Sequence, residues 1–210
     1  MSEAMRKSVN FWDRSAKRYE MQVKDDTTTV ILDTTYKYLH SSDKVLDFAC
    51  ATGMYALEIA SQVKDVWAID FSGEMIKLAE RNAAKRGITN VNFMQAEITD
   101  QRLKDQAFNT ILAFNILHLV EDPLRTLSNI KDLLQPGGML LSATPCLSKG
   151  GSLQELLIKC GSSAGIVPAV HPFKPKEVEA LIYDAQFDLI ESRIFTDQMS
   201  TVFIASRKRT

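Results

Sequence analysis

The residues of this 210-residue chain best suited to chemistry are two acids, each at the end of an apolar run. Asp47 follows Val45-Leu46 and precedes the small residues at 49–53, while Asp70 closes the run that begins at Val66. Their separation is that of a strand–helix–strand unit, which brings the small-residue turn and Asp70 to one edge of a parallel sheet. Because such small side chains leave the backbone open to a ligand, the pattern favours an adenosine-containing cofactor there.

Histidine and cysteine offer a second kind of chemistry. His118 follows a predicted strand and is the first candidate for a general base, because imidazole titrates near neutral pH and can take a proton from a hydroxyl or an amine. His171 is the second candidate, and a structural role is the alternative for both. The three cysteines are odd in number and widely spaced, which argues against a disulfide framework and a zinc site. We interpret Cys50 and Cys146 as small packing residues.

The charge and hydropathy of the chain disfavour several classes of partner. Lys and Arg total 25 against 26 Asp and Glu, and this formal net charge of -1 gives no support to a nucleic-acid partner. The N-terminal residues hold no apolar signal sequence, and the most apolar stretch, 111–120, is interrupted by Asn115 and His118. We therefore expect a cytoplasmic protein with reduced thiols and no membrane span.

Apolar runs that alternate with helical patterns must position these residues. The continuous apolar run 111–114 is typical of a central strand covered on both faces. Ser72 and Gly87 are the residue types that begin and end a helix, and they flank the helical pattern at 75–83. The alternation predicts a parallel, doubly wound α/β sheet. The predicted strands are 44–49, 65–70, 90–95, 109–115 and 139–144, and the predicted helices between them are 54–63, 75–83 and 124–134.

The last third of the chain has a different character. Residues 148–165 are rich in glycine and polar side chains, which indicates a loop and a short helix. A helix is predicted at 175–185, with Pro175 at its first position. Two strands, 187–195 and 201–207, are joined by a polar turn and predict an antiparallel hairpin at the edge of the sheet. The basic residues Arg207, Lys208 and Arg209 are interpreted as a solvated tail.

Together these pieces resemble the class I S-adenosylmethionine-dependent methyltransferases over nearly the whole chain. The loop 47–53 is similar to the family's acid-x-Gly-x-Gly-x-Gly turn, and 70–75 is similar to its Asp-x-Ser-x-x-Met stretch. Residues 133–138 match its Leu-Leu-x-Pro-Gly-Gly turn, and 108–118 resemble its fourth-strand segment. At the N-terminus, Phe11-Trp12-Asp13 with Ala16 and Tyr19 resembles the Phe-Trp-Asp-x-x-Ala-x-x-Tyr helix that covers the cofactor in bacterial small-molecule members.

The resemblance implies a single domain over 1–210. Its fold would be a seven-stranded, mostly parallel, doubly wound α/β sheet of the Rossmann-like kind, closed by a C-terminal antiparallel hairpin. Residues 1–40 would form an N-terminal helical cap, and 148–174 would be a variable region that contacts the substrate.

The resemblance also implies how S-adenosylmethionine is held. The loop backbone would pack against the methionyl part with Asp47 supporting its ammonium group, and Asp70 would accept hydrogen bonds from both ribose hydroxyls. Asp70 could instead cap a helix, although Ser72 competes for that place, and Phe71 could be a core residue rather than an adenine platform. Trp12 and Tyr19 could close over the cofactor or only anchor their helix. The other residues placed at the cofactor are Ala49, Cys50, Gly53, Met75, Ala96, Glu97, Ile98, Asn115 and Ile116.

Three positions depart from the family pattern. Ala49 and Ala51 replace the first two loop glycines, which is tolerable at negative φ but costs roughly 1 kcal/mol or more of strain at positive φ. Cofactor affinity depends on which of these holds. Gln186 replaces a frequent glycine before the sixth strand, which bears only on how the last helix ends.

The expected function is transfer of the sulfonium methyl of S-adenosylmethionine to an O, N, S or C nucleophile of a small molecule, with no metal and in a monomer or homodimer. One alternative is a non-catalytic module that binds S-adenosylmethionine or S-adenosylhomocysteine. A nicotinamide-dependent oxidoreductase is a second, but the small residues at 49, 51 and 53 lack the Gly-x-Gly-x-x-Gly register. An RNA methyltransferase is a third.

Overall fold

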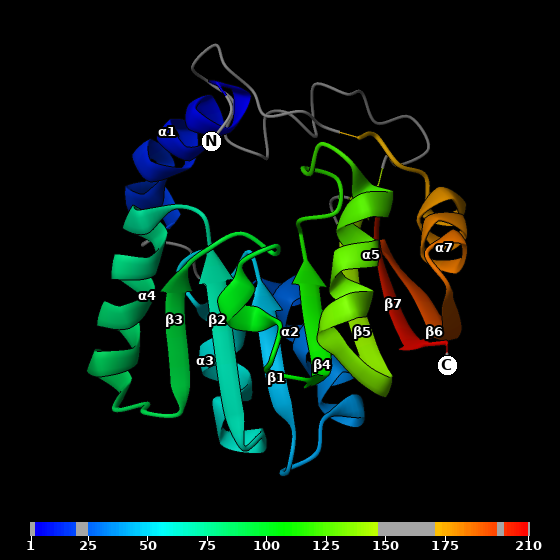
Figure 1. The fold of residues 1–210 in the computed structure, drawn as a ribbon, viewed down its shortest axis with the longest axis horizontal. Coiled ribbons are helices and arrows are strands. Elements are labelled where there is room, and N and C mark those ends of the chain that lie inside the picture. The colour runs from blue at the N-terminus through cyan, green and yellow to red at the C-terminus, as the bar shows by residue number, and fades with distance from the viewer. Residues whose placement is uncertain (1–2, 20–24, 147–170, 197–199, 210) are drawn as a thin grey trace.

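A single seven-stranded sheet organises the molecule (Figure 1). The computed structural model describes residues 3–19, 25–146, 171–196 and 200–209. The strand order is β3-β2-β1-β4-β5-β7-β6, and β7 pairs antiparallel with both β5 and β6 while the other pairs are parallel. The strands are β1 Lys44–Phe48, β2 Asp65–Asp70, β3 Val91–Gln95, β4 Phe108–Phe114, β5 Leu134–Cys146, β6 Phe187–Thr196 and β7 Ser200–Lys208. The predicted doubly wound sheet with a C-terminal antiparallel hairpin is confirmed.

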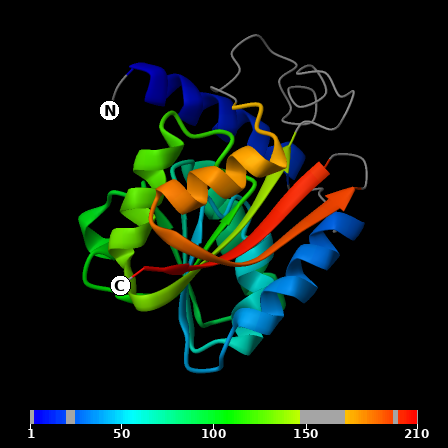
Figure 2. The ribbon, with the colours of Figure 1, turned by 90° about the vertical axis from the view of Figure 1, so that its right-hand side faces the viewer.

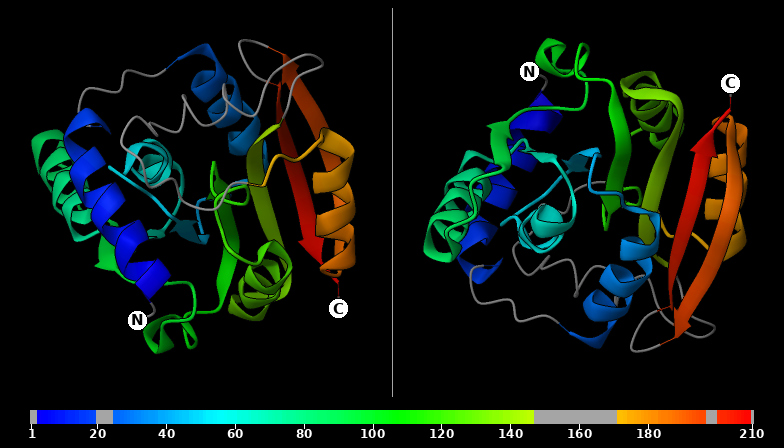
Figure 3. Two further views of the ribbon diagram at one scale, coloured as in Figure 1. Left: turned by 90° about the horizontal axis from the view of Figure 1, so that it is seen from above. Right: turned by 90° about the horizontal axis from the view of Figure 1, so that it is seen from below.

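Helices cover both faces of this sheet (Figure 3). They are α1 Glu3–Tyr19, α2 Asp26–Thr35, α3 Met54–Ile59, α4 Gly73–Arg86, α5 Pro123–Leu133 and α7 Pro175–Asp184, with short 3-10 turns η1 Tyr36–Tyr38, η2 Ala60–Gln62 and η3 Gln101–Leu103. One core cluster joins α5 and α7 to β4, β5 and β7, and a second joins α2 and α3 to the opposite face. The chain order reverses between β1 and β4, where the carboxyl ends of doubly wound sheets bind ligands.

The sequence signals for helix ends act as expected at α4. The Ser72 hydroxyl accepts a hydrogen bond from the Met75 N–H at 3.2 Å, and Gly87 ends the helix with φ +64°. The pattern at 54–63 is helical only to Ile59 and then tightens into η2.

The Pro-Gly-Gly turn is where the strand prediction differs most from the structure. β5 begins at Leu134, five residues before the predicted start, because Leu134 already pairs with Phe108 before the register shifts. A Cβ at Gly138 would lie 3.0 Å from the Gln135 carbonyl oxygen and 3.1 Å from that of Asn109. Glycine is therefore needed here to let two backbones approach, rather than to end the strand.

The C-terminal residues are part of the fold, so their interpretation as a solvated tail is wrong. The Lys208 ammonium donates to the Leu134 carbonyl oxygen at 2.6 Å. Arg209 pairs with Asp188 at 2.6 Å and stacks on the Tyr183 ring at 4.3 Å. These contacts hold the end of β7 against β5, β6 and α7. Helix α7 lies alongside the β6–β7 hairpin (Figure 2).

The predicted loop and short helix at 148–165 lie outside the described residues. No helix in the described part of the chain is long and apolar enough to cross a membrane.

Candidate functional site

The turn after β1 is held in a left-handed conformation at three positions. Ala49, Ala51 and Gly53 have φ values of +60°, +47° and +81°. Two backbone hydrogen bonds fix the turn, from Cys50 N–H to the Ile69 carbonyl oxygen at 2.9 Å and from Gly53 N–H to that of Cys50 at 2.9 Å. Both alanines therefore occupy backbone conformations that favour glycine, and the loop carries the strain that positive φ implies.

Space distinguishes Gly53 from the two alanines. A Cβ on Gly53 would lie 3.0 Å from the Phe93 ring and 3.1 Å from the Ala79 Cβ. The chain thus retains glycine at the position where a side chain has no room, and it has alanine at the two positions where only backbone strain opposes a methyl group.

Asp47 is a carboxylate enclosed by the fold. Asp47 is 2% exposed, and its Oδ2 accepts the Ala56 N–H at 3.1 Å. Burial raises the pKa of Asp47 to about 7; the Ala56 hydrogen bond opposes this rise and the charge of Asp70 adds to it. An acid so placed gains from a cationic ligand group that keeps it ionised.

Asp70 holds the loop from the end of β2. Its Oδ1 accepts the Ser72 N–H at 2.8 Å and its Oδ2 accepts the Ala51 N–H at 3.0 Å. Burial raises the pKa of Asp70 to about 6, the two backbone hydrogen bonds oppose the rise, and the charge of Asp13 adds to it. Ser72, and not Asp70, supplies the side chain that caps α4.

These two carboxylates fit the groups that S-adenosylmethionine presents. The donors described above for Asp47 and Asp70 are backbone N–H groups, and each ionised carboxylate has lone pairs for further donors. Ribose hydroxyls would supply such donors to Asp70, and an ammonium group would supply positive charge beside Asp47. The loop, Asp47 and Asp70 are the residues that would hold the cofactor.

Residues after β3 lie next to Asp70. The Ala96 N–H donates to the Asp70 carbonyl oxygen at 3.0 Å, and Ala96 and Ile98 are almost fully buried while Glu97 is exposed. Phe71 is half-buried, and its carbonyl oxygen accepts the Gln95 side-chain amide at 3.0 Å. Ala96, one of the residues predicted to lie at the cofactor, is thus hydrogen-bonded to the backbone of Asp70, the predicted ribose ligand.

Asn115 follows β4 in an unusual conformation. It is exposed, has φ +55°, and donates its N–H to the Ala143 carbonyl oxygen at 2.7 Å. Burial raises the pKa of Tyr55 to about 12, and the nearby side chains of Thr28 and Asn115 oppose this rise. The sequence did not single out Tyr55, because an apolar-faced helix explains an aromatic residue there equally well. Ile116 beside Asn115 is 8% exposed.

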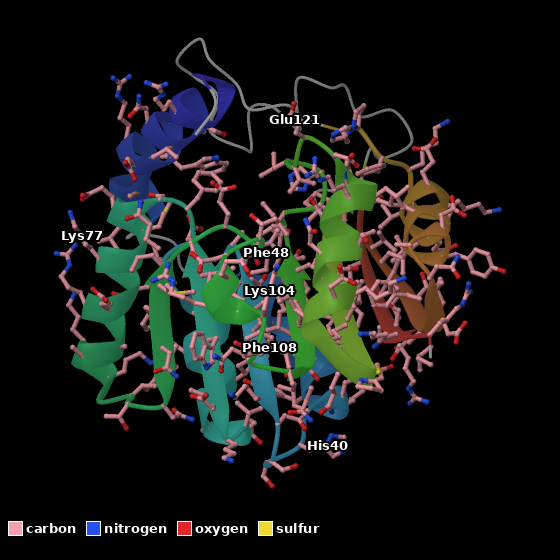
Figure 4. The ribbon with its side chains drawn as sticks, viewed as in Figure 1. His40, Phe48, Lys77, Lys104, Phe108 and Glu121 are labelled. Carbon is pink, nitrogen blue, oxygen red and sulfur yellow. The ribbon has the colours of Figure 1, made fainter. Side chains whose placement is uncertain are left out.

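His118 is a buried residue of the loop that follows β4. The residue is 2% exposed, and burial, with a smaller effect of the His171 charge, lowers its pKa to about 4. Its carbonyl oxygen accepts the His171 N–H at 2.8 Å. The imidazole is therefore neutral at pH 7, and its role as a general base stays a prediction. His40, by contrast, lies at the opposite end of the sheet from α1 (Figure 4).

Helix α1 lies beside α4 near the carboxyl ends of the strands (Figure 1). Ala16, Met75 and Leu78 form a small buried cluster, against which Trp12 and Ala51 pack. Met75 is 1% exposed in this cluster. Tyr19 ends α1, but its side chain lies outside the described residues.

Two further features bear on the chemistry. Cys50 is 5% exposed within the core cluster on the α3 face, and burial raises the pKa of its thiol. Within the described ranges, no group of three or more His, Cys, Asp and Glu side chains could hold a metal ion.

Comparison with known proteins identifies the family. A family profile described as a methyltransferase domain matches residues 39–186. The O-methyltransferase rstn1 of Aspergillus nomiae is 26% identical over 197 residues, which cover 92% of this chain and 84% of that protein. The 23S rRNA (uracil(1939)-C(5))-methyltransferase RlmD of Pasteurella multocida is 37% identical over 98 residues, covering 44% of this chain and 22% of its own length.

Solved structures share the fold. The [4+2]-cyclase SpnF superposes with a TM-score of 0.71 at 16% identity, covering 87% of this chain and 81% of that one. Since a likeness at this identity shows the fold alone, the family rests on the sequence profile, which spans the loop after β1, Asp70 and the Pro-Gly-Gly turn. The chain belongs to the class I S-adenosylmethionine-dependent methyltransferases.

Proposed function

We propose that this chain binds S-adenosylmethionine at the carboxyl ends of β1 to β4 and transfers its methyl group to a small-molecule acceptor. The main support for this proposal is the position of the Asp70 carboxylate. It is 8% exposed and lies at the carboxyl end of β2, the strand next to β1. It accepts two backbone N–H groups, which leave further lone pairs available.

The chain's own part in such a reaction is alignment. The bound cofactor supplies an activated methyl group on a sulfonium, and the protein holds donor and acceptor in line and excludes water. Correct orientation is worth on the order of 7–11 kcal/mol at best. Asp70 would orient the ribose, Asp47 the ammonium, and the left-handed turn would let the backbone approach the methionyl part.

A small acceptor is favoured over RNA by two observations. The formal net charge of -1 offers no general attraction to a polyanion. The O-methyltransferase rstn1 matches nearly the whole chain, whereas the rRNA methyltransferase RlmD is matched over 22% of its length. A cytoplasmic location is proposed with this function.

Calorimetric titration with S-adenosylmethionine and S-adenosylhomocysteine tests the proposal, with a nicotinamide dinucleotide as the negative ligand. We expect the first two to bind in the micromolar range and Asp70→Ala to lose at least about tenfold in affinity, because it removes a charged acceptor for two hydroxyls.

Asp65→Ala is the matched control. Asp65 begins the same strand and accepts hydrogen bonds from the Trp67 and Asn92 side chains, so its loss perturbs β2 at the far end from the site. Unchanged affinity in Asp70→Ala would contradict the ribose assignment. Failure of both adenosyl ligands to bind the wild-type chain would overturn the cofactor site, and steeply salt-dependent RNA binding would favour an RNA acceptor instead.

A further inference from the structure

The carboxylate of Asp13 connects α1 to the beginning of α4. Its Oδ1 accepts the Ser72 hydroxyl at 2.5 Å, and the Glu74 N–H donates to the same oxygen at 3.3 Å. Ser72 is 0% exposed and α4 begins at Gly73, so the acid lies where the helix dipole favours negative charge. One side chain thus satisfies two donors at the start of α4 and docks α1 there.

Ser72 connects Asp13 to Asp70 of the candidate cofactor site. Its hydroxyl also accepts the Met75 N–H at 3.2 Å, and its backbone N–H donates to Asp70 Oδ1 at 2.8 Å. The other Asp70 oxygen accepts the Ala51 N–H at 3.0 Å. A continuous series of hydrogen bonds therefore runs from α1 through Ser72 and Asp70 to the left-handed turn.

Apolar packing supports the same docking. Ala16 is 2% exposed against Met75 and Leu78, and Trp12 packs on this cluster together with Ala51. Viewed from above, α1 runs next to α4 (Figure 3). Helix α1 is therefore connected to the loop through this shared apolar cluster and through the polar series that begins at Asp13.

We propose that Asp13 is a positioning residue for the cofactor site: by holding Ser72 it fixes the carboxylate of Asp70, so that cofactor affinity depends on α1 being docked. The inference rests on the proposed function, since it concerns how the ribose ligand is oriented. By linkage, a bound cofactor strengthens the docking of α1 by the same factor.

Titration of S-adenosylhomocysteine into Asp13→Ala, Asp13→Asn and Arg14→Ala tests this role, together with hydrogen exchange of the α1 amides. Arg14 is the adjacent exposed residue of α1 and serves as the matched control. We expect about a tenfold loss of affinity in Asp13→Ala. Asp13→Asn should stay within about twofold of wild type, because its amide oxygen still accepts the Ser72 hydroxyl.

Hydrogen exchange supplies a readout that a merely structural role would not move. Bound S-adenosylhomocysteine should slow exchange of the α1 amides in the wild-type chain and in Asp13→Asn, but not in Asp13→Ala. Equal affinity in wild type and Asp13→Ala, or equal loss in both Asp13 variants, would overturn the role of Asp13 alone. A wild-type chain that binds no S-adenosylhomocysteine would overturn the proposed function and this inference with it.

Discussion

Three residues of the turn after β1 show how backbone strain and side-chain space act separately. Ala49 and Ala51 have positive φ values that favour glycine, whereas Gly53 combines positive φ with neighbours too close for a Cβ. The sequence could identify the turn, but alanine at two glycine positions of the pattern would normally favour negative φ, so the positive φ values could not be predicted. The structure shows that the loop tolerates strain at two positions and has no room for a side chain at the third.

Substitutions in this turn should follow that distinction. We expect Ala49→Gly and Ala51→Gly each to raise the free energy of unfolding by about 0.5–1 kcal/mol, since relief of left-handed strain exceeds the added entropy of the unfolded chain. Gly53→Ala should lower it by about 2 kcal/mol or more through strain and crowding together. Urea denaturation of each variant measures the change.

Ala84→Gly is the control for the cost of glycine itself. Ala84 is exposed within α4 and helical, so its replacement should cost about 1 kcal/mol. If Ala49→Gly and Ala51→Gly lower the free energy of unfolding as much as Ala84→Gly does, the alanines of the turn are not strained.

The elements of the fold were predictable to the extent that their signals are local. β2 was predicted with its observed bounds, because a short apolar run that ends in an acid is read directly from neighbouring residues. The early start of β5 depends on pairing with Phe108, and the docking of α1 joins Asp13 to Ser72 across 59 positions of sequence. Such contacts depend on tertiary structure that no local pattern contains.

The end of α7 provides a test at the scale of an element. Gln186 follows the helix with φ +67°, and its carbonyl oxygen accepts the Arg209 N–H at 3.2 Å, a bond that does not depend on its side chain. Gln186→Gly should therefore raise the free energy of unfolding by about 0.5–1 kcal/mol.

Gly87→Ala is the reciprocal change at the end of α4. Gly87 has φ +64°, and a Cβ there would have nothing within 4 Å, so the substitution adds strain without a clash. We expect the free energy of unfolding to fall by about 1 kcal/mol, as measured by thermal or urea denaturation. If the free energy of unfolding rises in Gln186→Gly and falls in Gly87→Ala, backbone strain is supported as the cause. A lower free energy of unfolding in Gln186→Gly would contradict it.

For the whole molecule, the predicted site places two carboxylates where the folded chain disfavours their charge. Burial raises the pKa of Asp47 to about 7 and that of Asp70 to about 6, against an ordinary value of 3.8. Stability and cofactor binding therefore oppose one another at these positions, as they commonly do where function requires a strained or charged site.

The pH dependence of the ligand-free protein should reveal this opposition. Because both carboxyls bind protons more tightly in the folded chain, their contribution favours folding at low pH and is lost as pH rises from about 4 through 7. Asp47→Asn removes the contribution of Asp47 to this pH dependence. We therefore expect the free energy of unfolding of this variant to exceed that of wild type by on the order of 3 kcal/mol at pH 8 and by little at pH 4.

Asp100→Asn should instead lower the free energy of unfolding above pH 4. Arg102 lowers the pKa of Asp100 to about 2, so the ionised Asp100 carboxylate favours folding at those pH values.

The affinity for S-adenosylhomocysteine should change with pH in the direction opposite to the stability of the wild-type chain. Its affinity should rise from pH 5 to pH 7.5 as the two carboxylates ionise, and that rise should be smaller in Asp47→Asn. Unfolding and calorimetric titrations at matched pH values measure both effects. If Asp47→Asn has the same stability difference from wild type at pH 4 and pH 8, the charge of Asp47 is not what the fold opposes.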